Sequence, residues 1–321
     1  MKRLPRRIRL KRLRTLHVAS STGRGRPRFI SAASGLATVG KWLYVIADDQ
    51  LHLGVFAVNG TVAGTLVRLL PGELPKAPKK RKARKPDFEV LTLLPRFAGC
   101  PHGALLALGS GSRPNRRRGV LVPLDPAGAV QGSPRVIDLS GLYLRLEKEF
   151  GELNVEGAVV LGKHLCLLNR GHPREGGSAV AWLSLPAVLR AISSSDAIGA
   201  LRCRVRHYDL GSAEGIPLGF TDGAALPGGG IVFTAVAESA DDSYVDGPCV
   251  GAVVGMLATD GELRWLRKLR PVLKVEGITL RPGSRGREFL LVTDADCATV
   301  PARLYAARVD PGKATTRSKR R

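Results

Sequence analysis

Carboxylates recur along this sequence at the edges of short apolar runs. Four of these runs open on an acidic residue, and the four acids are Glu89, Glu156, Asp222 and Glu276. A second polar set follows the next apolar run of each repeat: Asp48, Asp49, Ser110, Ser112, Asn169, Arg170, Glu238, Asp294 and Asp296. Carboxylates gathered in one place cannot all stay ionised without a compensating charge, and calcium best fits carboxylate and carbonyl oxygens. We therefore predict a Ca2+ site whose contacts come from Asp49, Glu89, Glu156, Asp222, Glu238, Glu276 and Asp294.

Basic and polar side chains stand beside these acids in the sequence. The run 109–118, GSGSRPNRRR, is rich in glycine and arginine and is suited to holding a phosphate or carboxylate, although a solvated hairpin turn has the same composition. It lacks the Gly-Lys-Ser/Thr ending of a P-loop, so nucleotide hydrolysis is not indicated. The residues expected to contact a small anionic ligand are Ser112, Arg113, Arg116, Asn169 and Arg170.

A structural role for the acids is the alternative. Each acid would then hydrogen-bond backbone amides of a neighbouring unit and hold the fold together, and the recurrence of an acid in four units favours this role. The uneven second polar set favours a ligand site. The sequence has neither an H-E-x-x-H nor a G-x-S-x-G motif, so neither a zinc protease site nor a nucleophilic serine is indicated.

Five repeats position these residues. Their first strands begin at Ser34, Glu89, Glu156, Asp222 and Glu276, at spacings of 55, 67, 66 and 54 residues. Ser34 takes the place of the acid in the first repeat. Each repeat is a meander of short strands rich in β-branched residues and separated by Gly, Pro, Asn or Asp turns. Four strands per repeat, arranged radially, form the blade of a β-propeller.

The last repeat has only three strands of its own. Residues 8–18, IRLKRLRTLHV, alternate apolar and basic residues as an edge strand does, and we expect them to supply the missing outer strand. The prediction is an all-β propeller of five four-stranded blades. Six blades are the alternative, with the additional blade within 139–154 or 186–200. One helix is expected, over 186–192.

In a propeller the first strand of each blade lines the central channel. The start of a first strand and the end of a second strand lie at the same end of a hairpin, so both polar sets are expected at one mouth of the channel. Residues 1–28 form a basic segment that includes the closing strand, residues 29–310 a single propeller domain, and residues 311–321 a basic disordered tail.

Basic residues are concentrated in a few runs. The chain of 321 residues has 50 Lys and Arg against 27 Asp and Glu, a formal net charge of +23. Runs without acids carry 11 basic residues in 1–28, seven in 76–85, four in 113–118 and five in 311–321, so the rest of the chain nets −4. This distribution excludes a uniformly basic, histone-like protein. Residues 76–85, KAPKKRKARK, are expected to form a protruding loop between the first two blades.

The five cysteines are spread singly, which argues for reduced thiols and against a disulfide framework or a zinc site. No apolar segment follows the basic N-terminus, and the longest apolar run, 249–258, is about half of the ~20 residues that cross a bilayer. We therefore expect a cytoplasmic protein with no membrane partner.

Several motifs resemble those of an uncharacterised bacterial family of propeller proteins, a domain of unknown function. They include VIADD at 45–49, GALLALGSGSRPNRRRG at 103–119, LNVEGAVVLG at 153–162, GFTDGAAL at 219–226 and VEGITL at 275–280. The likeness covers about residues 30–310. The group is more distantly similar to phytase-like and SdiA-regulated-type propellers, which share an acid-Gly step entering each blade. The resemblance implies the propeller fold and, at a distance, calcium and phosphoester chemistry.

Three functions follow as hypotheses. The first is binding of a small anionic ligand, of Ca2+ or of both at the acidic mouth, extending to metal-dependent hydrolysis of an ester or phosphoester. The second is a non-catalytic scaffold for a protein partner, with the acids in structural roles. The third is sequence-independent association with nucleic acid through the basic runs.

Overall fold

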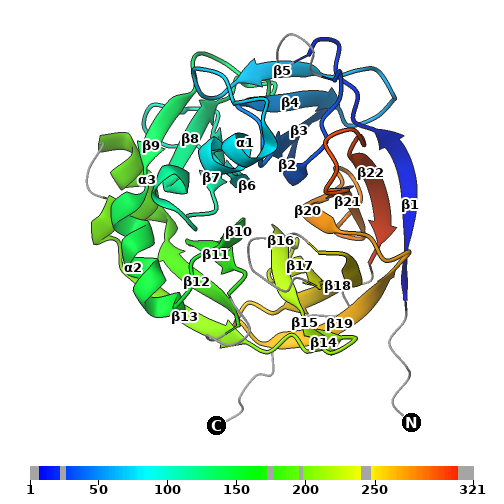
Figure 1. The fold of residues 1–321 in the computed structure, drawn as a ribbon. Helices are drawn as coiled ribbons and strands as arrows, with labels where there is room; N and C mark the ends of the chain where they lie inside the picture. Colours follow the sequence, from blue (N-terminus) through cyan, green and yellow to red (C-terminus); the bar gives the residue numbers. More distant parts are fainter. Residues whose placement is uncertain (1–6, 22–26, 172–176, 195–197, 240–246, 310–321) are drawn as a thin grey trace.

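The computed structural model describes residues 7–21, 27–171, 177–194, 198–239 and 247–309. Its strands are arranged in a ring around a central channel (Figure 1), which confirms the predicted β-propeller. The predicted tail at 311–321 lies outside the described residues.

Three sheets have four strands each, in sequence order from the channel outward. The first contains β2 (Ala33–Val39), β3 (Trp42–Ala47), β4 (His52–Ala57) and β5 (Thr65–Arg68). The second contains β6 (Phe88–Leu94), β7 (Ala104–Gly109), β8 (Arg118–Pro123) and β9 (Arg135–Asp138). The third contains β10 (Val155–Leu161), β11 (His164–Asn169), β12 (Ser178–Ser184) and β13 (Cys203–Tyr208).

The remaining large sheet has eight strands. Its first half is β16 (Gly219–Ala225), β17 (Ile231–Glu238), β18 (Cys249–Leu257) and β19 (Leu263–Arg270). Its second half is β20 (Val275–Leu280), β21 (Glu288–Thr293), β22 (Arg303–Arg308) and β1 (Ile8–Thr15). Grouped in this way, the strands of the ring form five units of four. A short hairpin, β14 (Ser212–Ala213) with β15 (Ile216–Pro217), lies between the third and fourth units.

The N-terminal strand closes the ring as predicted. β1 pairs antiparallel with β22 from Leu10 to Thr15, and it also runs parallel to β19 at Ile8 and Arg9. The predicted segment is slightly longer than the strand, since His17 and Val18 make only isolated bridges. The alternation of residues in β1 explains its placement, because Ile8 and Leu10 are buried while Arg9 is exposed.

The described residues form three α-helices outside the sheets, and the sequence predicted only one of them. The predicted helix is α3 (Leu185–Ser194), which the 3-10 turn η2 (Ile198–Ala200) follows. The second is α2 (Ser140–Phe150), which buries Leu142, Leu146 and Phe150 at helical spacing. The stretches proposed for a sixth blade therefore contain helices in their described parts. None of the helices described is long and apolar enough to cross a membrane.

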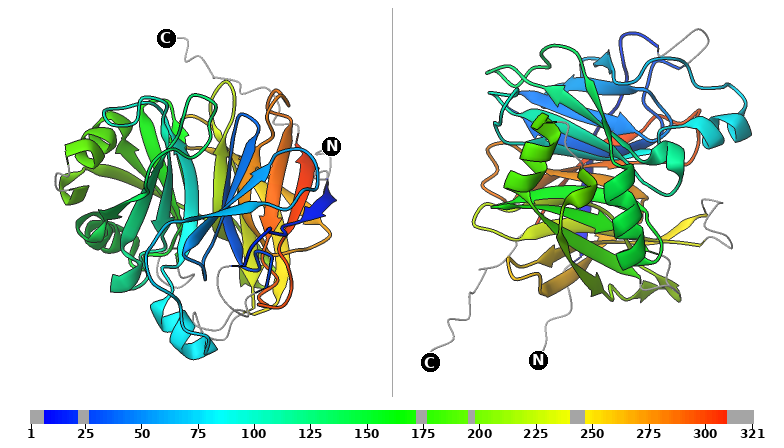
Figure 2. Two further views of the ribbon diagram at one scale, coloured as in Figure 1. Left: turned by 90° about the horizontal axis from the view of Figure 1, so that it is seen from above. Right: turned by 90° about the vertical axis from the view of Figure 1, so that its left-hand side faces the viewer.

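The third helix corrects the predicted loop at 76–85. Residues Pro78–Arg84 form α1, which has Pro at its start and no buried residue. Figure 2 shows that α1 projects from one end of the ring. The 3-10 turn η1 (Pro114–Arg116) lies in the glycine-rich run that precedes β8.

Apolar side chains fill the space between neighbouring sheets. These clusters are mainly aliphatic, consistent with a sequence in which only 5% of residues are aromatic. An edge-to-face pair, Phe220 with Phe233 at 4.8 Å between ring centroids, packs in the cluster between the third and fourth units. The packed sheets hold the innermost strands β2, β6, β10, β16 and β20 around the channel.

Candidate functional site

A β-bulge lies near the start of every innermost strand, at the same end of the channel. The pairing between first and second strands slips by one residue in all five units. The residues left unpaired by the slip are Ser34, Glu89, Glu156, Thr221 and Glu276. Bulges commonly re-aim side chains near functional sites.

This register corrects the expected equivalence of the four acids. In the fourth unit the bulge position belongs to Thr221, and Asp222 stands one residue later, where Gly35, Gly157 and Gly277 stand in other units. Asp222 is followed by glycine, as acids of other repeats are, so the sequence does not reveal this shift of one residue. The shift changes the direction in which the side chain of Asp222 points.

Asp222 holds two units together. Its side chain is 1% exposed, and it accepts hydrogen bonds from the backbone N–H of Gly223 at 2.7 Å and of Ile278 on β20 at 2.9 Å. Burial raises the pKa of Asp222 well above its usual range, against the opposing effect of the two backbone donors. For this acid the geometry supports the structural alternative.

Arg170 joins three carboxylates from three units. It follows β11, and its guanidinium lies 3.4 Å from Glu156, 3.3 Å from Glu238 and 3.4 Å from Glu276. Its Nε also donates to the carbonyl of Phe220 at 3.1 Å. Because the guanidinium already faces three acids, its surroundings favour cations over anions as further ligands.

Lys274 extends this network to the last unit. Its Nζ lies 3.6 Å from Glu238, 3.7 Å from Glu276 and 2.6 Å from Asp296. Its backbone carbonyl accepts from the N–H of Asp294 at 3.1 Å. No sequence pattern singles out Lys274, since its role depends on strand ends that meet only in the folded ring.

A second network lies beside α1. Arg81 pairs with Asp49 at 3.0 Å, and Lys85, directly after the helix, contacts the carboxylates of Asp48 and Asp87. The distance from Lys85 Nζ to Asp87 Oδ1 is 2.8 Å. The basic run 76–85, predicted to form a protruding loop, therefore contributes two cations that contact these acids.

Arg116 also points into this network. Its Nη1 donates to Asp87 Oδ2 at 2.7 Å and to the hydroxyl of Ser112 at 2.8 Å, while Ser110 donates to Asp87 at 2.5 Å. Its Nη2 donates to the carbonyl of Lys82 in α1. Arg116 and Ser112, predicted as contacts for an anion, thus surround a carboxylate of the protein itself.

The other two predicted anion contacts occupy different settings. Asn169 is fully buried; its side chain accepts from the N–H of Asn154 at 2.7 Å and donates to the carbonyl of Glu152 at 3.0 Å. Arg113 is half-buried at the start of η1. Whether any of the five residues contacts a ligand stays a prediction.

The tightest group of acids combines Asp48, Asp87 and Glu89. One oxygen from each carboxylate lies within 4.8 Å of the others, a separation that allows all three to hold one metal ion. Of the three, only Glu89 belongs to the predicted metal set. Asp48 belongs to the second polar set without being a predicted metal contact, and Asp87, directly before Phe88, was missed.

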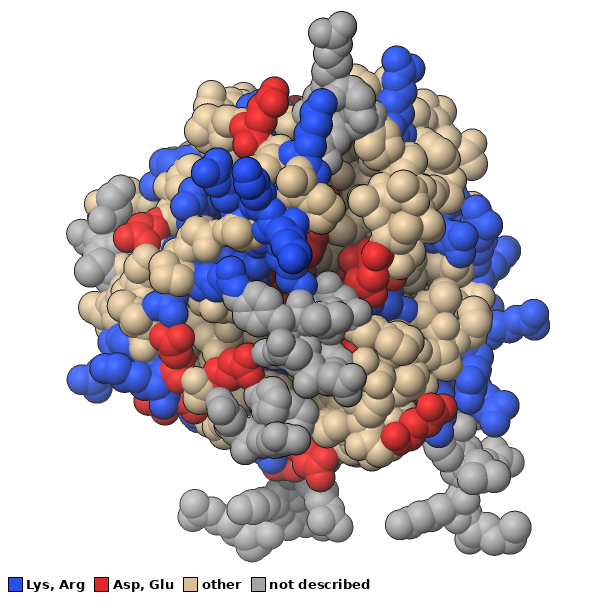
Figure 3. Space-filling view, viewed as in Figure 1, with Lys and Arg blue, Asp and Glu red and all other residues tan. Residues whose placement is uncertain are grey.

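These networks bring together nine carboxylates, and we call this group the acidic mouth: Asp48, Asp49, Asp87, Glu89, Glu156, Glu238, Glu276, Asp294 and Asp296. Five described basic residues pair with them, namely Arg81, Lys85, Arg116, Arg170 and Lys274. If every group were ionised, these nine carboxylates and five cations would leave four negative charges. Figure 3 shows red acidic atoms deep in the centre of this face and blue basic atoms over α1.

Burial makes this excess charge costly. It raises the pKa of Asp48 to about 6, of Glu276 to about 7, and of Glu156 and Asp294 to about 8. Burial and the neighbouring carboxylates Asp87 and Glu156 raise the pKa of Glu89 well above its usual range. One oxygen of each of Asp48, Asp49 and Glu276 is buried without a hydrogen-bond partner. The mouth therefore favours either protons or an added cation.

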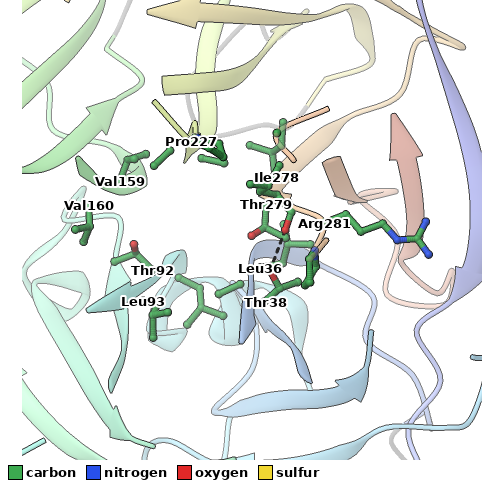
Figure 4. A pocket seen from close by; sticks show the side chains of 18 of the residues that line it. Leu36, Thr38, Thr92, Leu93, Val159, Val160, Pro227, Ile278, Thr279 and Arg281 are labelled. Carbon is green, nitrogen blue, oxygen red and sulfur yellow. Dashed lines mark hydrogen bonds between the residues drawn. The ribbon is translucent and has the colours of Figure 1, made fainter. Parts of the chain in front are cut away.

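The opposite end of the channel is chemically different. A cavity of about 660 Å³ opens there, lined by residues of all five innermost strands. Figure 4 shows Leu36, Thr92, Val159 and Ile278 around this space. Its wall is mostly apolar, and Arg281 and Arg285 are the charged residues that line it.

The comparison with protein families gives a match over most of the chain. A model of the family described as "Family of unknown function (DUF6929)" matches residues 29–309. No curated protein matches the sequence. Among solved structures, Myxococcus xanthus glutaminyl cyclase is similar at a TM-score of 0.48 and 13% identity, covering 96% of this chain and 100% of that one.

Two other solved structures are similar over most of their length. The Pan2 WD40 domain of Neurospora crassa has a TM-score of 0.42 and 8% identity, covering 97% of this chain and 99% of its own. An alpha-L-arabinanase of Penicillium chrysogenum, complexed with arabinobiose, has a TM-score of 0.43 and 8% identity, covering 92% and 98%. At these scores the likenesses carry no argument about activity.

Proposed function

The chain belongs to the DUF6929 family of unknown function, and we propose that it binds a cation, with calcium as the best fit, in the acidic mouth of its propeller channel. The observation that carries the proposal is the approach of the Asp48, Asp87 and Glu89 carboxylates to within 4.8 Å of one another. A protein cation, the ammonium of Lys85, already contacts two of them. The position is thus one that favours positive charge.

The donor set fits calcium better than magnesium. Each of the three carboxylates offers one oxygen to a shared ion, and calcium completes irregular arrangements of six to eight oxygens with carbonyls and water, whereas magnesium demands a near-ideal octahedron. Asp48 has a buried oxygen without a hydrogen-bond partner among the described residues, which is available for this role. For calcium to bind, the ammonium of Lys85 has to move aside, which the position of Lys85 at the end of an exposed helix permits.

A hydrolytic role is the second candidate, and one feature favours it. Lys79, Lys80 and Arg84 are exposed on α1, beside the mouth, and they would attract an anionic ester or phosphoester towards a bound cation. The cation would supply polarisation of the ester or phosphoryl oxygen. Arg116 and the hydroxyl of Ser112 would then keep Asp87 in place rather than bind the substrate.

Calorimetric titration with Ca2+ at about pH 8 tests the proposal, because the buried acids Asp48 and Glu276, with pKa values of about 6 and 7, are then largely ionised. The test variant is the double substitution Asp87→Asn and Glu89→Gln. Asp87 has a φ of +56°, which asparagine also adopts readily, so the backbone is expected to keep its shape. The matched control is Asp260→Asn with Glu262→Gln, two acids on an exposed turn.

We expect the wild type and the control to bind Ca2+ alike, and the test variant to bind at least ~10-fold more weakly. Absence of binding to the wild type would refute the proposal and leave the non-catalytic scaffold as the better reading. Equal affinity of the test variant would refute the assignment to Asp87 and Glu89.

A further inference from the structure

A second charged surface lies on the outer flank of the ring, away from the channel. It is formed where the N-terminal strand joins the two halves of the eight-stranded sheet, in the strand order β19, β1, β22. These three strands contain no acidic residue. Figure 3 shows blue side chains along the flank where Figure 1 draws β1.

The basic residues of this flank share one face of the sheet. Arg7, Arg9 and Lys11 are exposed and alternate with the buried Ile8 and Leu10. Residues two apart on a strand point to the same side, about 6.6 Å from each other. Arg9 and Lys11 of the strand, with Arg7 directly before it, therefore form a row of three exposed cations, while Ile8 and Leu10 are buried in the core.

The neighbouring strands extend this row. Arg9 stands directly opposite Arg270 of β19, so both side chains lie on the same face, which Lys268 shares two residues earlier. On the other side, Lys11 stands opposite Ala306 of β22, and Arg308 lies two residues further on. We call the basic face the set Arg7, Arg9, Lys11, Lys268, Arg270 and Arg308.

The charges of the basic face are available for a partner. Within the described part of the chain none of the six has an ion pair, and all six side chains are exposed. The nearest acid across the sheet, Glu288 opposite Arg308, is already paired with Arg281 at 3.1 Å. The sequence that continues beyond the two adjoining strand ends, residues 1–6 and 310–321, adds eight Lys or Arg and one Asp.

We propose that the basic face binds the phosphate backbone of nucleic acid, without regard to base sequence. Charge complementarity selects a polyanion, and four of the six residues are arginines, whose guanidinium groups match phosphate oxygens in geometry. A surface that binds a membrane would instead combine basic residues with exposed large apolar side chains. The exposed large hydrophobics of the described chain are Val62, Leu93, Val136 and Leu144, and none lies on these three strands.

The proposal has a measurable consequence in its salt dependence. Each phosphate that a protein neutralises releases condensed counterions, so the logarithm of the binding constant falls by about 0.9 per contact for each tenfold rise in salt. Six contacts predict a slope of about −5 with duplex DNA. Removing three of them should flatten the slope by about 2.7 and weaken binding on the order of 100-fold at ~0.1 M salt.

The experiment measures fluorescence anisotropy of a labelled duplex of arbitrary sequence, ~20 base pairs long, between about 50 and 200 mM salt. The test variant is Arg9→Gln, Lys11→Gln and Arg270→Gln. The control is Lys148→Gln, Lys163→Gln and Arg202→Gln, which removes the same charge from exposed positions outside the basic face. If the test variant does not fold, Lys268→Gln with Arg308→Gln replaces it, since both side chains are exposed.

Binding with the steep slope, a flatter slope in the test variant and an unchanged slope in the control would support the proposal. An equal loss in the control would assign the binding to overall charge and overturn it, as would absence of binding by the wild type at the lowest salt. Sedimentation of the protein with vesicles of anionic phospholipid, without binding to the duplex, would overturn it in favour of a membrane.

Discussion

Replacing Arg170 by methionine removes the cation that three mouth carboxylates share. The side chains of Glu156 and Glu276 are 7% exposed and that of Glu238 is 14% exposed, so their unpaired charges would remain largely buried. Removing one partner from a buried ion pair typically costs 3–5 kcal/mol. Because Arg170 itself keeps 22% of its side-chain exposure, we expect the lower end, about 3 kcal/mol, when the acids are ionised.

The cost of Arg170→Met depends on pH. The pKa of Glu276 is about 7 and that of Glu156 about 8, so both acids are ionised at about pH 8.5 and protonated at about pH 5.5. With neutral acids the missing cation matters little, and we expect the cost to fall below ~1 kcal/mol at the lower pH. Urea unfolding at the two pH values measures both costs.

Arg264→Met is the matched control for this experiment. Arg264 pairs with Asp260 at 3.0 Å, and the two side chains are 44% and 56% exposed, so the substitution should change stability little at either pH. The reasoning about the buried network would be refuted if Arg170→Met cost the same at both pH values, or less than ~1 kcal/mol at about pH 8.5.

Two further predictions concern the same mouth. Lys85→Met removes the ammonium that contacts Asp48 and Asp87, so Ca2+ should bind at least ~10-fold more tightly in calorimetry, and weaker binding would contradict the proposed position of the ion. Because the folded-state pKa of Glu156, Glu276 and Asp294 is raised, the folded protein holds more protons than the unfolded chain between about pH 4.5 and 8. The free energy of unfolding of the metal-free protein should therefore fall as the pH rises through this window, and a rise in denaturant midpoints would count against the raised pKa values.

Much of the ring was predictable from local patterns. The acid-Gly steps at Glu156 and Glu276 marked two of the innermost strands, because each acid is the bulge residue near the start of a strand that continues as an apolar run. The strand at the N-terminus was predictable from its alternation and from the missing fourth strand of the last repeat. A calcium site was predicted as well, on a different combination of mouth acids, and calcium binding stays a proposal.

The details of the site depended on contacts that sequence patterns do not carry. Thr221 rather than Asp222 occupies the bulge. A slip in pairing by one residue leaves no mark in the sequence, so the sequence predicted Asp222 at this position. Lys85 and Arg81 were predicted to lie in a protruding loop. In the structure α1 and its C-terminal end position them to form ion pairs with acids of the first two units. Lys274 and Arg170 were likewise connected only by the closing of the ring, which places the third, fourth and fifth units side by side.

Anomalous diffraction from crystals grown with Ca2+ tests the central claim most directly. We predict a peak within about 2.3–2.6 Å of carboxylate oxygens from Asp48, Asp87 and Glu89, with the side chain of Lys85 moved away. A mouth that holds no ion at high Ca2+, with Lys85 still between Asp48 and Asp87, would contradict the account.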